Sequence, residues 1–101
     1  MREEAEAEAD TLLGEEERWT YWGVLARPVL AGLLLARDRG GLQNHHVFDW
    51  ARARDAGPAL EASADDPQLR LFIDTTLQAP AEELSGMWAV VNAAVRRLPG
   101  T

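Results

Sequence analysis

The residues best suited to bind a metal ion are His45, His46 and Asp49, which lie close together in the sequence. If they lie on a helix, Asp49 faces the same side as either histidine, because residues three or four apart are neighbours on a helix surface. A closed zinc site takes four ligands, and this group supplies at most three, with no cysteine in the sequence to complete it. A metal-binding helical protein therefore stays one alternative, beside the simpler interpretation that the histidines pack or hydrogen-bond in the first turn of a helix.

Residue patterns that would support catalysis are sparse. Ser63 and Ser85 are the only serines, and neither lies in the strand–turn–helix context of an activated nucleophile. Gly40–Gly41 follows a predicted helix and has no lysine after it, so it does not match a phosphate-binding loop. The acid pairs Asp65–Asp66 and Glu82–Glu83 stand at predicted helix starts, where capping explains them. We therefore expect a protein that is not an enzyme and needs no cofactor.

Large apolar side chains exceed what one small helical domain is expected to bury. Tryptophan occurs four times, and each indole buries on the order of 200 Å² when covered. Soluble monomers seldom expose large apolar patches, so part of this surface is expected to contact another chain. The sequence thus favours a non-enzymatic protein–protein interaction module that binds a protein partner or a second copy of itself; the alternative is that every apolar group fits inside one monomer. The predicted contact residues are Trp22, Leu30, Leu34, Trp88 and Val91.

Arginine supplies every basic residue of the chain, and its first half has a positive bias. The residues that could form a nucleic-acid contact are Arg27, Arg37, Arg39, Arg52 and Arg54. Trp50 lies near them in the sequence and could stack on a base. The pI of about 4.7 opposes this function, because a negatively charged protein repels phosphate backbones. Nucleic-acid binding is therefore expected only within a larger complex, and the alternative is that these arginines pair with acids in the second half of the chain.

The order of several features resembles that of the small helical subunits of CRISPR effector complexes. A long apolar helix is followed by Gly41–Leu42, a short helix with Trp50, then Thr75–Thr76, and Trp88 ahead of Arg96–Arg97. The resemblance covers residues 30–98. It implies a helical subunit that stacks in rows with other subunits and contacts nucleic acid through basic residues.

The acidity of the chain is concentrated at its N-terminus. Residues 1–17 hold eight acids and one arginine, which accounts for the whole formal net charge of −7. Residues 18–54 hold six arginines against two acids, and residues 55–101 hold three arginines against seven acids. Repulsion between glutamates four residues apart weakens an isolated helix. We therefore predict an acidic segment over 1–14, a frayed or partner-dependent helix anchored only by Leu12 and Leu13, and a single helical domain over 15–101.

The elements that would position these residues are all predicted to be helices. Apolar residues spaced by three or four positions, beginning at Trp19, predict the longest helix over 15–38, with a kink or break at Pro28. Shorter helices are predicted over 45–55 and 58–64.

An N-cap followed by proline, Asp66–Pro67, predicts a helix over 67–78. Its expected core face is Leu69, Phe72, Ile73 and Leu77. The last helix is predicted to open at Pro80 and to end at Pro99–Gly100. No segment shows sustained β alternation, so the chain is predicted to be all-α, a small bundle of four to five helices whose core is formed by the last helix and the 15–38 helix.

The stretch Trp19–Ala36 is apolar enough to be compared with a membrane-spanning helix. Arg27 lies at its centre, where a charge costs about 2.5–3.5 kcal/mol on insertion scales. A secretory signal is disfavoured as well, because acids precede the apolar stretch where positive charge is expected. We therefore expect no membrane insertion and a cytoplasmic location.

Overall fold

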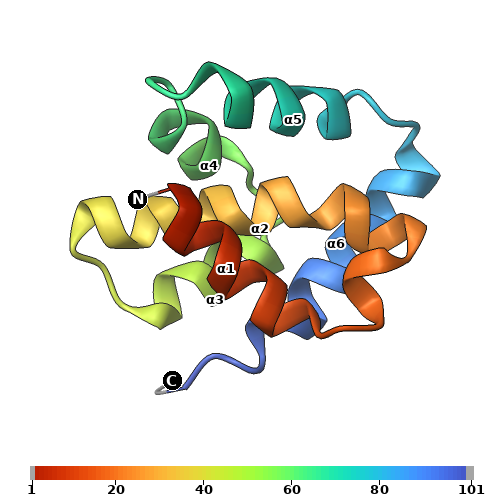
Figure 1. The fold of residues 1–101 in the computed structure, drawn as a ribbon, viewed down its shortest axis with the longest axis horizontal. Coiled ribbons are helices and arrows are strands. Elements are labelled where there is room, and N and C mark those ends of the chain that lie inside the picture. The colour runs from red at the N-terminus through yellow and green to blue at the C-terminus, as the bar shows by residue number, and fades with distance from the viewer. Residues whose placement is uncertain (1, 100–101) are drawn as a thin grey trace.

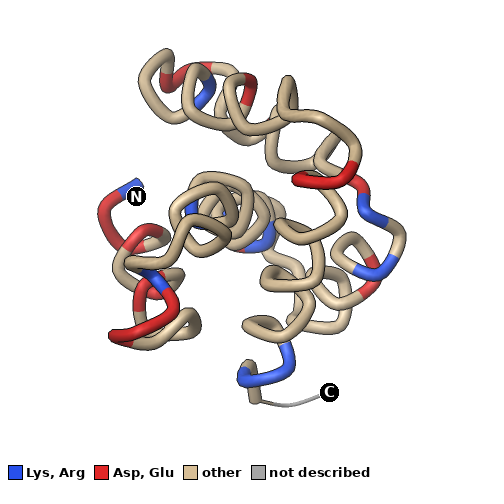
Figure 2. Tube along the Cα trace, turned by 90° about the vertical axis from the view of Figure 1, so that its right-hand side faces the viewer, with Lys and Arg blue, Asp and Glu red and all other residues tan. Residues whose placement is uncertain are grey.

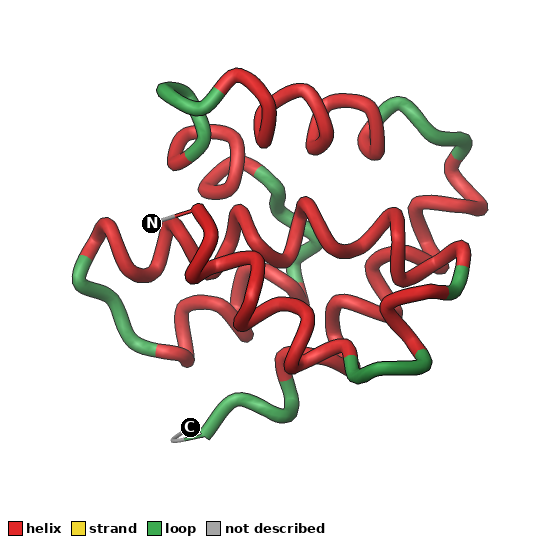
Figure 3. Tube along the Cα trace, in the orientation of Figure 1, coloured by secondary structure: helices red, strands yellow, loops and turns green. Residues whose placement is uncertain are grey.

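A computed structural model of the chain describes residues 2–99, and within this range it contains helices joined by loops and no strand (Figures 1 and 3). The elements are α1 (Arg2–Leu13), a short 3-10 helix η1 (Glu17–Trp19), α2 (Tyr21–Gly40), α3 (Asn44–Arg52), α4 (Gly57–Ala62), α5 (Pro67–Leu77) and α6 (Ala81–Val95). The predicted all-α class is confirmed. Gly100, predicted with Pro99 to end the last helix, lies outside the described residues.

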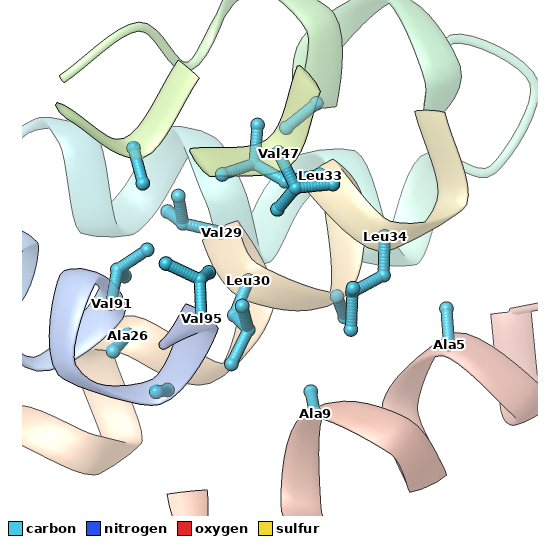
Figure 4. Packing of buried hydrophobic residues seen from close by; sticks show 14 of the residues in the cluster. Ala5, Ala9, Ala26, Val29, Leu30, Leu33, Leu34, Val47, Val91 and Val95 are labelled. Carbon is cyan, nitrogen blue, oxygen red and sulfur yellow. The ribbon is translucent and has the colours of Figure 1, made fainter. Parts of the chain in front are cut away.

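Helix α2 is the centre of the fold and contacts every other α-helix (Figure 1). Every residue from Val29 to Leu35 is buried, because neighbouring helices cover several faces of α2 rather than one stripe. Helix α6 lies along one of these faces and places Met87, Val91 and Val95 in the core (Figure 4 labels the two valines). The prediction that these two helices form the core is confirmed. Helix α2 continues across Pro28 without a break.

The start of the central helix differs from the prediction. Gly14 has a φ of +85°, a conformation that glycine adopts at little cost, and it follows the end of α1. Thr20 has extended backbone, and its hydroxyl oxygen accepts a hydrogen bond from the Gly23 N–H at 3.0 Å, so α2 begins at Tyr21 instead of residue 15. Trp19 consequently lies before the helix, 74% exposed, and the prediction that it begins the buried stripe is wrong.

The acidic N-terminal segment forms a helix that docks on α2. Its buried residues are Ala5, Ala9, Leu12 and Leu13. The two alanines project toward α2 (Figure 4), and their small side chains allow the helices to approach closely. The prediction that only the two leucines anchor this helix is therefore wrong, because Ala5 and Ala9 are buried as well. Fraying of this helix in solution stays a prediction.

Helix α5 begins as its start signal predicts. The Asp66 carboxylate accepts a hydrogen bond from the Leu69 N–H at 3.2 Å, and Pro67 is the first helical residue. Leu69 and Ile73 are buried as expected, but Phe72 is exposed, so its place in the predicted core face is wrong. The buried position on this face is taken instead by Thr76. Thr76 can be buried because its hydroxyl donates a hydrogen bond to the Leu25 carbonyl of α2 at 3.1 Å.

Thr76→Val is expected to lower the free energy of unfolding by about 1 kcal/mol, because it removes this link between α5 and α2 while keeping the side-chain volume. Thr75→Val is the matched control: the Thr75 hydroxyl is exposed and bonds to Leu71 within its own helix. Urea unfolding followed by circular dichroism measures both variants. Equal stabilities of the two variants would contradict the assignment of a stabilising role to the Thr76–Leu25 bond.

Candidate protein-contact surface

Four of the five predicted contact residues are buried in the core of the chain. Leu30, Leu34 and Val91 have no exposed surface, and Trp88 is nearly as well buried. They do not form a contact surface on this chain. Neighbouring helices, including α1 and α4, cover Leu30 and Leu34 of α2, and the packing of α6 against α2 and α3 buries Trp88 and Val91. The approach of α4 is close: a Cβ atom at Gly32 would lie 2.7 Å from the Cβ of Ala59.

A different set of large apolar side chains remains exposed. All but one of the exposed large hydrophobic residues in the described chain come from η1, the first turn of α2 and the middle of α5; the exception is Leu42. We call this set the aromatic surface. It consists of Trp19, Tyr21, Trp22, Val24, Leu71 and Phe72. Of the predicted contact residues, only Trp22 belongs to it.

Part of the aromatic surface is hollowed into a groove of about 610 Å³. The groove lies between α1, η1, α2 and α5. Its apolar lining comes from Trp19, Val24, Pro28 and Phe72, and its polar lining from Asp10, Arg18 and Arg27. Residues from four separate segments therefore define one concave apolar site, which is the usual shape of a binding site in a small protein.

The two aromatic residues that begin α2 are held in place by α6. The Trp22 ring lies directly over Gly86, where an added Cβ atom would come within 2.7 Å of it. The Tyr21 hydroxyl donates a hydrogen bond to the Glu83 carboxylate, and the two rings meet edge to face with centroids 5.2 Å apart. These contacts fix the rings while leaving much of their area exposed, so the ordering cost of binding another chain would be small.

The two arginines of the groove differ in their partners. Arg27 Nε donates to Asp10 Oδ1 at 2.6 Å and Arg27 Nη2 donates to Asp10 Oδ2 at 3.1 Å. The hydrogen bonds that Arg27 donates to Asp10 raise the pKa of Arg27, despite the opposing effect of its partial burial. The Arg18 guanidinium has no carboxylate partner in the described chain; it lies over the Trp19 ring at 5.3 Å, and its Nε is buried without a hydrogen-bond acceptor. Sequence reasoning did not single out Arg18, although an arginine directly before an exposed tryptophan is a signal that could have done so.

The remaining arginines predicted to bind nucleic acid do not gather at one site. Arg37 pairs with Glu8 at 2.7 Å, Arg39 with Asp65 at 2.7 Å and Arg52 with Asp49 at 2.5 Å. The paired residues are Arg27, Arg37, Arg39 and Arg52, whereas Arg54 is exposed with a φ of 54°.

The acids that pair with these arginines come from three parts of the chain, and the pair of Arg52 with Asp49 lies within α3 itself. Pairing with the second half is found for Arg39, and its hydrogen bond holds the pKa of Asp65 below the ordinary value. The acids of α1, which gather near the N-terminus in Figure 2, take Arg27 and Arg37 instead. A phosphate backbone would have to displace these carboxylates, so nucleic-acid binding through this set stays a prediction that the geometry does not favour.

The predicted metal ligands do not converge. The His46 ring caps α3, because its Nδ1 accepts a hydrogen bond from the Gln43 N–H at 3.3 Å. The His45 ring stacks on that of His46 with centroids 4.1 Å apart, and Asp49 is engaged by Arg52. No group of three or more potential ligands in residues 2–99 is arranged to hold an ion. The contacts of His46 agree with the simpler interpretation, a histidine that hydrogen-bonds in the first turn of a helix.

Fold and surface together define a small all-α globule with exposed aromatic side chains gathered in one region. No helix among residues 2–99 is both long enough and apolar enough to cross a membrane. No protein-family model, curated protein or solved structure matches the chain. The resemblance to small CRISPR effector subunits therefore remains an interpretation of the sequence alone.

Proposed function

We propose that this chain is a non-enzymatic protein–protein interaction module and that the aromatic surface makes the contact. The observation that carries the proposal is that the exposed aromatic side chains come from η1, the first turn of α2 and α5, and that two of them, Trp19 and Phe72, line one apolar groove. Outside the aromatic surface, Leu42 is the one large exposed hydrophobic residue of the described chain. Contiguous exposed apolar patches on soluble proteins commonly mark interaction sites.

The composition of the surface supports a protein partner. Tryptophan and tyrosine are enriched among the residues that dominate binding energy at protein interfaces. Trp19 contributes most strongly here, because it is 74% exposed and an indole covers on the order of 200 Å² when fully buried. Trp22 and Tyr21 add a rigid edge that α6 supports.

Replacing Trp19 and Phe72 together by serine is expected to abolish partner binding while changing the free energy of unfolding by less than about 1 kcal/mol, because both side chains are exposed. Light scattering after size exclusion measures self-association. Affinity capture from the native host, followed by mass spectrometry, measures binding to other proteins.

Leu42→Ser is the matched control, because it removes an exposed apolar side chain outside the aromatic surface. The proposal is supported if a dimer, or a specific captured protein, is retained by wild type and Leu42→Ser and lost from the double variant. It is overturned if wild type is monomeric and captures nothing that the double variant loses.

A further inference from the structure

We propose that the groove binds a peptide segment of a partner protein that places a bulky apolar side chain between Trp19 and Phe72 and a carboxylate against Arg18. The inference rests on the proposed function and adds to it the chemistry of the partner.

The state of Arg18 is the first observation. Arg27 also lines the groove, and both oxygens of Asp10 accept hydrogen bonds from its guanidinium. Arg18 lines the same groove without a carboxylate partner in the described chain, and its buried Nε lacks an acceptor. The Nε atoms of Arg2 and Arg70 also lack one, but those two arginines form ion pairs with Asp66 and Asp74. A buried donor without an acceptor is costly, and a carboxylate is the acceptor whose geometry suits the guanidinium fork. Within the described chain Arg18 thus contacts the Trp19 ring but forms no ion pair, and a carboxylate from a partner would supply one.

The apolar lining is the second observation. Trp19, Val24, Pro28 and Phe72 surround a volume of about 610 Å³. This volume lies within the range of about 300–1,000 Å³ that is usual for pockets of drug-sized ligands, and it can take one or two large side chains. Leu71 and Tyr21 are also exposed but do not line the groove, so a small molecule in the groove would leave both uncovered. A peptide segment fits this extended surface better than a free small carboxylic acid does.

The charge around the groove limits how acidic the partner can be. Glu15 and Glu16 are exposed immediately before η1, and the whole chain carries a formal charge of −7. A polyanion is repelled by this field, whereas a single carboxylate can still reach Arg18 at short range. The matching segment is therefore apolar with one acid and otherwise neutral or basic. The same field disfavours the phosphate backbone of a nucleic acid.

A display library of random dodecapeptides, selected on the full chain, tests the inference. We expect the selected peptides to share a bulky apolar residue. Within one helical turn of that residue, we expect a carboxylate from Asp, from Glu or from a free C-terminus. Arg18→Gln is expected to weaken their binding by about tenfold or more, the size of a lost charged hydrogen bond. Arg96→Gln removes an exposed arginine at the end of α6 and is expected to leave binding unchanged.

A charge exchange adds a readout that loss of folding cannot imitate. Arg18→Glu is expected to lose the selected peptide and to bind a version in which Arg replaces the acid. Selected peptides that lack an acid, that ignore Arg18→Gln, or that never enrich overturn the inference. If the selected peptides lack an acid or ignore Arg18→Gln but their binding still requires Phe72, the inference fails and the proposed function stands. If the selected peptides bind equally well to wild type and to the Trp19/Phe72 double variant, both the inference and the proposed function fail.

Discussion

Replacing Leu34 by alanine is expected to lower the free energy of unfolding by about 2–5 kcal/mol, the usual cost of emptying a buried leucine site. Leu34 has no exposed surface and lies on the side of α2 that faces Ala5 and Ala9 of α1 (Figure 4). The methyl groups of both alanines are too short to move into the cavity, so these neighbours cannot fill it. Chemical denaturation followed by circular dichroism measures the change.

Leu42→Ala is the control for the Leu34 variant, because it removes the same atoms from a leucine that is 37% exposed just after the C-terminal end of α2. Its expected cost is much smaller, within about 1 kcal/mol. Similar losses for the two variants would contradict the placement of Leu34 in the core. A loss confined to Leu34→Ala would confirm that this residue, a predicted contact residue, stabilises the monomer instead.

Gly23→Ala is expected to displace η1 and with it the groove. A Cβ atom at this position would lie 1.8 Å from the carbonyl oxygen of Glu17, a backbone atom that cannot move without the whole turn. Overpacking of this kind costs about 1–3 kcal/mol, which exceeds the gain of about 1 kcal/mol that alanine brings inside a helix. Because η1 carries Arg18 and Trp19, binding to the aromatic surface is expected to fall as well. Denaturation and the near-ultraviolet dichroism of tryptophan report the two effects.

Gly40→Ala is the matched variant for the glycine test. Its added Cβ would meet only side-chain atoms of Leu42, at 3.0 Å, and that side chain can move. This variant is expected to be neutral or slightly more stable. If Gly23→Ala were stabilised to the same degree, η1 would not be packed against α2 as described.

The sequence predicted the elements that depend on local signals. The start of α5 is an N-cap followed by proline, and Asp66 and Pro67 take those two places. The apolar density of α2 and α6 predicted that they form the core, which is confirmed. Helix periods and caps are encoded by neighbouring residues, so they can be recognised without knowing what packs where.

Features that depend on contacts between distant segments were not predictable in the same way. Apolar spacing predicted that Trp19 begins a buried stripe. The N-cap of α2 is instead Thr20, one residue later, so the Trp19 indole precedes the helix and is exposed. The glutamates of α1 repel one another in isolation, yet Glu8 and Asp10 meet Arg37 and Arg27 across the helix interface. These ion pairs join residues far apart in the sequence. They follow from the docking of α1 on α2 and could not be read from the order of charged residues along the chain.

Apart from Trp22, the aromatic surface was missed for the same reason. Sequence composition correctly indicated more large apolar side chains than the core accepts, but periodicity assigned the surplus to Leu30, Leu34 and Val91. The packing of α1, α4 and α6 around α2 buries these three residues instead. The surplus lies on η1, the first turn of α2 and α5, where side chains such as Trp19 and Phe72 are not covered by neighbouring helices.

Photo-crosslinking from position 71 tests the central claim most directly. Leu71 is 62% exposed next to Phe72, and a photoreactive phenylalanine analogue placed there samples whatever covers the aromatic surface in the cell. The same analogue at Leu42 samples an exposed apolar position outside it. We predict a discrete crosslinked protein from position 71 that is absent from position 42; no product at position 71, or the same products from both positions, would contradict the account.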